Sequence, residues 1–430
     1  MGIFENITSV VLLLLFAVTV SYFSYRREGL FITPINVMVW PYVIVSIMVN
    51  VVGIHFGYFA VHLKSIFFVL SCMTFFGIGG ILIQKFLNDD YEIEQQHKLQ
   101  DMFTQYRSAF IIVGIIAILA GFIHFYHALN QVGGWVQIAS REFEEAYGKG
   151  LLAHVMVLNR PAFLFLAAYF LYRKRVSVLA LLVLMFVTVL VLQIKNNIIT
   201  ILLGAFYFSY LFKLVKFNLK KAFVYAIVIF VLFNVSYIIG YTRIGVSNAY
   251  SSKIQEYLVH LFFSYLFGGP IGTSEIFNYA QYPMYSMKEV FAVPINLYNV
   301  LLLGSSDIIE IIIRHWIPIS TNYRFFHSTN VFGLFGMLYA FIGVYGSLIY
   351  MFFLGVFAYL LKYLSYKKNA FVGFQLVYTF FLSYLTLAFF GLFFNIIIVS
   401  EVIVVMLIVP LINNVWKMLW GSIDAYSVGT

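Results

Sequence analysis

The chain contains a series of apolar stretches, each close to the length that an α-helix needs to cross a lipid bilayer. Residues 10–20, 109–121 and 176–194 are apolar almost without interruption. A hydrocarbon core about 30 Å thick is crossed by about 20 residues of helix, whose backbone groups bond to one another rather than to water. Strands of a membrane β-barrel would instead alternate polar and apolar residues over short segments. The sequence therefore predicts an all-α, polytopic integral membrane protein.

The composition also indicates a chain that is embedded in lipid. Hydrophobic residues make up 63% of the sequence and charged residues only 10%, which exceeds the apolar share of a soluble domain. Cys72 is the only cysteine and falls inside a predicted span. A single thiol excludes an intramolecular disulfide and a metal cluster held by several thiolates.

Hydropathy over windows of about 19 residues predicts about eleven transmembrane helices. They lie near residues 5–23, 33–53, 64–85, 107–127, 151–172, 176–194, 197–213, 221–240, 337–361, 371–391 and 396–416. The sequence shows no internal repeat and no second domain. We therefore expect residues 1–430 to form a single polytopic membrane domain.

The lysines and arginines between the spans predict the orientation. Sixteen of the 26 fall on one side, which the positive-inside rule makes cytoplasmic, nine fall on the other, and Arg160 lies within a span. We therefore expect an outer N-terminus and a cytoplasmic C-terminus. The formal charge of +9 follows from this bias, and cations scattered over short turns do not indicate nucleic-acid binding.

Two loops on the outer side are long enough to carry chemistry. The larger covers residues 241–327 and the smaller covers residues 128–150. Apolar residues at helical spacing over 254–265 predict an amphipathic helix that ends in a turn at Phe-Gly-Gly-Pro, residues 267–270. Residues 296–313 are apolar but hold two carboxylates, so we expect an interfacial or cavity-lining helix there. The larger loop is therefore predicted to be structured and to cover the membrane surface.

Arg160 is the strongest candidate for a functional charge. It lies roughly 13 Å below the outer end of the fifth span, at 1.5 Å per residue, and a buried arginine needs an anion or a water-filled cavity. Two interpretations stay open: Arg160 belongs to an anion site, or it snorkels or pairs with a carboxylate such as Glu401. Lys195 and Arg243 flank neighbouring spans and are candidates for the same cavity, as is His154.

Further outer cations are candidates for binding an anionic substrate. Arg141 lies in the smaller loop, where the acids that follow it are an alternative partner. Arg314 lies four residues after Glu310, so a surface ion pair is the alternative to a direct role. Arginine offers paired donors that suit a phosphate or a pyrophosphate.

Three motifs lie in or beside the larger loop. They are Tyr265-x-Phe267-Gly268-Gly269-Pro270, then Arg243-Ile244-Gly245, and Thr329-Asn330-Val331 leading into Tyr339-x-Phe341-x-Gly343-x-x-Gly346. The chain resembles the bacterial O-antigen and oligosaccharide repeat-unit polymerases of the Wzy type over most of its length. This resemblance rests on the three motifs, the many spans and the single dominant loop. Ala340 departs from that pattern, since many members carry an acid there.

The resemblance implies a GT-C-like glycosyltransferase of lipopolysaccharide biosynthesis in the bacterial inner membrane. Its substrates would be undecaprenyl-pyrophosphate-linked repeat units and the growing polymer, joined at the periplasmic face. The growing chain would move from its lipid pyrophosphate to the non-reducing-end hydroxyl of a new repeat unit. Membrane lipid and a chain-length regulator protein are the partners that this implies.

The demands of such a reaction assign roles to the candidate residues. Prearranged cations stabilise the departing diphosphate, and the candidates for this role are Arg160, Arg243 and Lys195. His327 is the first choice for the group that accepts the acceptor proton, with capping of the following helix as its alternative role. Glu145 and Glu401 are the other candidates for this base. The expected substrate-binding residues are Arg141, Lys195, Arg324, Arg314, His154, Asn330, Tyr265 and Gly269. The sequence has no nucleotide-binding Gly-x-x-x-x-Gly-Lys-Ser/Thr pattern and no Asp-x-Asp, so we expect no cofactor and no metal requirement.

Three other functions stay open at this point. A lipid-oligosaccharide flippase or other transporter also combines many spans with interior cations, although it usually has related halves and no dominant loop. The ligase that moves finished polymer to lipid A shares the chemistry and differs mainly in its acceptor. A purely structural scaffold would not require an arginine within a helix.

Overall fold

The computed structural model describes most of the chain. Its described residues are 3–86, 95–138, 140–191, 195–218, 251–277, 285–304, 308–309, 315–321, 328–367 and 370–427, with a few single positions between 220 and 238. Over these residues the secondary structure is almost entirely helical, apart from two strands of two residues each.

Eight helices within the described ranges are long and apolar enough to cross a membrane. Two shorter apolar helices, α8 (Val176–Val191) and α9 (Lys195–Leu211), fall at two further predicted spans. This confirms the prediction of an all-α polytopic membrane protein. Most of the predicted span at 221–240 lies outside the described residues, so the number eleven stays a prediction.

The contacts divide the chain into two compact units. The first comprises residues 1–89, 250–360 and 384–400, and the second comprises 90–249, 361–383 and 401–430. The chain passes between these ranges several times, and the single polytopic domain stays a prediction.

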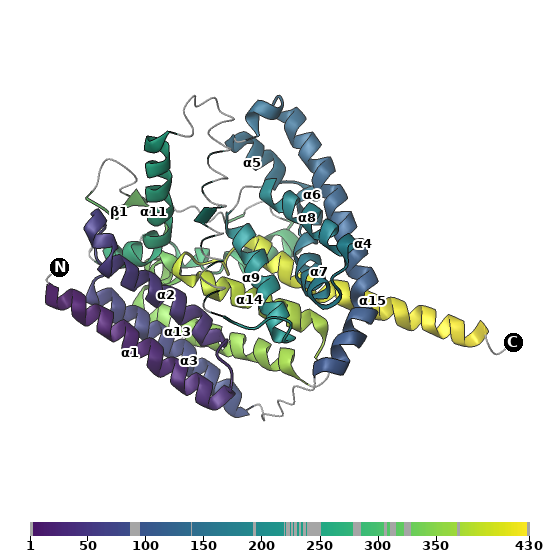
Figure 1. Ribbon diagram of the computed structural model, residues 1–430, viewed down its shortest axis with the longest axis horizontal. Coiled ribbons are helices and arrows are strands. Elements are labelled where there is room, and N and C mark those ends of the chain that lie inside the picture. The colour runs from purple at the N-terminus through teal and green to yellow at the C-terminus, as the bar shows by residue number, and fades with distance from the viewer. Residues whose placement is uncertain are drawn as a thin grey trace. The chain divides into compact units, whose positions relative to one another are not determined.

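The first unit is built on three neighbouring helices. They are α1 (Ile3–Glu28), α2 (Pro34–Val51) and α3 (Leu63–Phe86), which pack on one another (Figure 1). The Thr33 side chain accepts a hydrogen bond from the Asn36 backbone N–H, and Pro34 occupies the first turn, so α2 begins with a capped end. The short helix η1 (Gly53–Phe56) ends at Gly57, whose φ of 86° suits glycine.

The helix α11 (Ser252–Ile276) packs on α2 and α3. The strands β1 (Ile317–Pro318) and β2 (Ser328–Thr329) pair antiparallel and contact the same helix. Three further elements are η3 (Met287–Glu289), α12 (Ala292–Leu302) and η4 (Leu387–Phe389). The helix α13 (Gly333–Tyr366) begins in this unit and has a non-helical residue, Gly343, inside it.

The predicted turn at residues 267–270 is wrong. The helix α11 continues through Pro270 to Ile276. Its glycines serve close packing: a β-carbon on Gly269 would overlap the Phe389 carbonyl, and one on Gly272 would lie 2.5 Å from the Val331 carbonyl oxygen. The helix therefore passes within van der Waals contact of other backbone segments, which larger residues would prevent.

The second unit gathers helices around α4 (Gln95–Gln131). Following it along the chain are η2 (Trp135–Gln137), α5 (Arg141–Gly148), α6 (Leu151–Met156) and α7 (Asn159–Arg173). The helix α7 packs on α4, α8 and α9. Most of α14 (Val372–Thr386) and of α15 (Ile397–Ser427) also belongs here. Buried aromatic residues, including Phe103, Phe110 and Phe165, fill the space between α4 and α7.

Candidate functional site in the second unit

Arg160 lies at the start of α7, at a break in the predicted fifth span. The helix α6 ends at Met156 and α7 begins at Asn159, so the span consists of two helical segments. Pro161 is the third residue of α7 and lies in the first turn, where its missing N–H leaves no helical hydrogen bond unmade. The proline thus favours a helix start at this place and brings Arg160 into the first turn.

The Arg160 side chain is buried and points to α9. It is 6% exposed, and its Nη2 donates a hydrogen bond to Asn197 Oδ1 at 2.7 Å. Asn197 is also buried and lies in the first turn of α9. An amide oxygen that accepts from a guanidinium fixes its direction, and the amide itself carries no net charge. This geometry suits the recognition of an anion.

The preceding residue, Asn159, holds α7 to another helix. Its Nδ2 donates to the Met185 carbonyl oxygen at 2.9 Å and to Thr188 Oγ1 at 2.7 Å, both on α8. The Thr188 hydroxyl in turn donates to the same carbonyl at 2.8 Å. Buried hydrogen bonds of this kind contribute about 1 kcal/mol each and cost more when one partner is removed. The first turn of α7 is therefore fixed to α8 by Asn159 and to α9 by Arg160.

His154 lies on α6, six residues before Arg160. Its Nδ1 is 3.1 Å from Glu401 Oε2 on α15, and both side chains are partly open to solvent. An imidazole beside a carboxylate has the composition of a proton-transfer pair. The sequence offers Glu401 as one partner for Arg160, and the structure places Glu401 beside His154.

Two predicted binding residues of this unit are placed by backbone only. Arg141 is the first residue of α5, where the Ser140 side chain accepts from the Phe143 N–H and caps the helix. Lys195 is the first residue of α9, in the same turn as Asn197. The side chains of Arg141 and Lys195 lie outside the described residues, as does the whole of Arg243.

Two motif residues of the first unit, Tyr265 and Gly269, lie on α11. Tyr265 stacks on Phe390 with ring centroids 6.2 Å apart, and Gly269 packs on the Phe389 backbone. Asn330 follows β2 and is partly buried. These contacts account for the motif by packing, and substrate binding by these three residues stays a prediction. Arg314, Arg324 and His327 lie outside the described residues.

Sequence reasoning missed a polar cluster at the start of α3. His62 Nε2 lies 3.5 Å from Glu275 Oε1, its backbone N–H donates to Ser274 Oγ at 2.8 Å, and the Leu63 N–H donates to Glu5 Oε1 at 3.4 Å. The hydrogen bond that His62 donates to the Glu275 carboxylate raises the pKa of His62; burial opposes this rise, and the charges of Glu275 and Glu5 add to it. No local signal predicts this cluster, because its members come from three helices.

Among the residues that the structure describes, no three His, Cys, Asp or Glu side chains gather as they would around a metal ion. The expected metal independence stays a prediction.

Comparison with known proteins gives a family without an activity. No curated protein and no solved structure matches the chain. One family model matches residues 57–418, which include both units' helices from α3 to most of α15. By this match the chain belongs to the family of unknown function DUF6337.

Proposed function

We propose that the protein is a membrane glycosyltransferase that joins undecaprenyl-pyrophosphate-linked oligosaccharide repeat units into an O-antigen-type polysaccharide. The reaction would take place at the periplasmic face of the bacterial inner membrane, with the N-terminus periplasmic and the C-terminus cytoplasmic. The observation that carries the proposal is the buried Arg160 guanidinium, which Asn197 orients inside a membrane-spanning segment.

The bond changes define what the site must do. The bond between the anomeric carbon of the growing chain and its pyrophosphate oxygen breaks, and a glycosidic bond forms to the acceptor hydroxyl. The hydroxyl proton passes to a base, and undecaprenyl pyrophosphate leaves with an added negative charge. Because the donor bond already stores the energy, the reaction consumes no nucleotide. The protein's task is to stabilise the leaving diphosphate and to take up one proton.

Arg160 fits the first of these tasks. A guanidinium presents paired donors to phosphate oxygens, and burial strengthens its attraction for charge that develops during the reaction. The Asn197 amide restricts the guanidinium before substrate arrives, so little reorganisation is needed. Ionisable side chains within membrane-spanning segments are rare and commonly mark functional sites, which favours a role for Arg160 beyond that of a structural scaffold.

The proton acceptor is assigned within the same proposal. His327 remains the first candidate from the resemblance. The pair of His154 and Glu401 is a second candidate because the 3.1 Å contact orients the imidazole. Substituting His327 and His154 separately distinguishes them, since only the base should lower turnover without changing the binding of the donor lipid.

The proposal is tested by reconstituting the purified protein in vesicles with lipid-linked repeat units and following ladder formation on gels. Arg160→Gln should lower the rate by about 10²-fold or more, as expected when one group that stabilises developing charge is lost. Arg160→Lys should retain part of the activity because it keeps the charge but not the planar donor pair. The matched control is Arg26→Gln, which removes an exposed arginine at the end of α1.

Three outcomes of this assay would contradict the proposal. If the Arg160→Gln protein folds and forms ladders at the wild-type rate, the guanidinium has no role in the reaction. If the lipid-linked unit crosses the vesicle membrane and no new glycosidic bonds form, the protein is a transporter. Transfer to lipid A without polymerisation identifies a ligase.

A further inference from the structure

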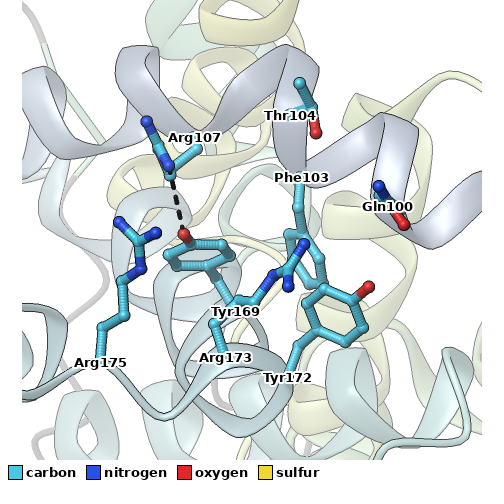
Figure 2. A pocket seen from close by; sticks show the side chains of 8 residues that line it. All are labelled: Gln100, Phe103, Thr104, Arg107, Tyr169, Tyr172, Arg173 and Arg175. Carbon is cyan, nitrogen blue, oxygen red and sulfur yellow. Dashed lines mark hydrogen bonds between the residues drawn. The ribbon is translucent and has the colours of Figure 1, made fainter.

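A second concentration of positive charge lies at the other end of α7. A pocket of about 180 Å³ opens between the N-terminal part of α4 and the C-terminal end of α7. Figure 2 shows the side chains that line it, which include three arginines: Arg107 from α4, Arg173 from the last turn of α7, and Arg175 just beyond it. A pocket of this volume admits more than a single solvent molecule.

Aromatic side chains position two of these arginines. Arg107 Nη1 donates to the Tyr169 hydroxyl at 3.4 Å, drawn as the dashed line in Figure 2, and the Arg173 guanidinium carbon lies 4.8 Å from the centre of the Tyr172 ring. Phe103 is buried beneath both tyrosines, with ring centroids 5.3 Å from each. A cation over an aromatic face is held without losing its charge. The pocket therefore has a rigid aromatic base with guanidinium groups around it.

The turn after α7 brings the third arginine to the pocket. Lys174 caps the helix in the left-handed conformation, with φ of 52°, and its N–H donates to the Phe170 carbonyl at 2.7 Å. This conformation is uncommon for a residue other than glycine and reverses the chain direction sharply. As a result Arg173 and Arg175, on either side of Lys174, both line the pocket.

No carboxylate among the described residues forms a salt bridge with any of the three arginines. The positive-inside rule and the negative end of the α7 dipole explain cations in this region, but not their convergence on one pocket. Like charges placed together repel, so an anionic ligand would relieve the repulsion.

We propose that this pocket binds a phosphate group. The ligand chemistry is a phosphate monoanion or dianion that accepts paired hydrogen bonds from guanidinium groups, with the hydroxyls of Tyr169 and Tyr172 as further donors. Its source is either the headgroup of an anionic phospholipid or free phosphate. The loop cations predict that this end of α7 is cytoplasmic, where basic pockets between transmembrane helices bind anionic headgroups.

This site is separate from the proposed transfer site. Arg160 and Arg173 are thirteen residues apart on α7, which is roughly 20 Å along the helix axis at 1.5 Å per residue. The inference therefore does not rest on the proposed glycosyl transfer.

The test measures binding to the full-length protein in detergent. Native mass spectrometry is used to titrate short-chain phosphatidylglycerol and, for comparison, zwitterionic phosphatidylcholine, and the effect of inorganic phosphate on thermal unfolding is followed in parallel. The test variant is the triple substitution Arg107→Gln, Arg173→Gln and Arg175→Gln. The matched control removes three exposed cations at helix ends of the first unit: Arg26→Gln, Arg27→Gln and Lys85→Gln.

We expect the wild-type protein to prefer phosphatidylglycerol over phosphatidylcholine, and the test variant to lose at least tenfold in affinity while the control binds normally. If inorganic phosphate stabilises the wild-type protein but not the test variant, the ligand is a free phosphate ion. If phosphatidylglycerol binds but inorganic phosphate does not stabilise the wild-type protein, the ligand is a lipid headgroup. Equal binding by the wild type and the test variant, an equal loss in the control, or binding of neither ligand by the wild type would overturn the proposal. If the triple variant does not fold, Arg175→Gln alone carries the test, since this side chain is exposed.

Discussion

Gly269→Ala tests whether the Phe-Gly-Gly-Pro motif serves packing. An added β-carbon would lie 2.9 Å from the carbonyl carbon of Phe389 and would overlap its oxygen, whereas ordinary contact begins near 3.4 Å. The carbonyl oxygen is the nearest obstacle, so the two backbones must separate by on the order of 1 Å or more. Overpacking costs about 1–3 kcal/mol when side chains can adjust, and here the obstacle is backbone, so we expect a loss near 3 kcal/mol.

The assay is thermal unfolding of the purified protein in detergent, followed by tryptophan fluorescence. Gly148→Ala is the matched control, because its β-carbon meets nothing within 4 Å at the end of α5, and its effect should stay within about 0.5 kcal/mol. A Gly269→Ala protein that unfolds at the wild-type temperature yet forms no ladders would refute the packing argument. That result would instead assign the glycine to substrate binding.

Three further predictions concern the polar contacts and metal dependence. A double-mutant cycle of Arg160→Gln and Asn197→Ala, measured by unfolding in detergent, should give a coupling of about 1.5–3 kcal/mol, as for a buried hydrogen bond to a charged group; additive effects would mean that the 2.7 Å contact does not form. Because Glu275 raises the pKa of His62 above its ordinary 6.5, protonated His62 stabilises the fold below that pH, and this stability is lost as pH rises through the folded-state pKa. His62→Gln should remove this pH-dependent part, at most about 1 kcal/mol for a partly exposed pair, while His55→Gln should leave it intact. Excess chelator should leave ladder formation unchanged, and a loss restored by adding a divalent cation would contradict the expected metal independence.

The sequence predicts the helices well where long apolar stretches end at turns. The expected spans at 5–23 and 33–53 correspond to α1 and α2 at Ile3–Glu28 and Pro34–Val51. The break before α7 was not predicted, although Pro161 three residues into the helix is a recognisable start signal. Glycine and proline at 267–270 predict a turn because they disfavour isolated helices, whereas tertiary packing outweighs that preference in α11.

The candidate site is only partly readable from the sequence. Arg160 stands out because a charge inside an apolar stretch needs an explanation. Asn197 gives no such signal, since one amide near a helix start is common and its partner lies 37 residues away. The pairing of His154 with Glu401 depends on α6 and α15 meeting, which hydropathy does not predict.

Because Asn159 and Arg160 are adjacent in sequence, a shift in one helix of the second unit can move a side chain that contacts another helix. Asn159 is hydrogen-bonded to α8, Arg160 is hydrogen-bonded to α9, and a single peptide bond joins the two residues. A displacement of the Met185 carbonyl is therefore passed through Asn159 to the neighbouring Arg160. Variants in the lipid-embedded middle of α8 can thus misalign a charge on another helix while leaving every predicted site residue unaltered.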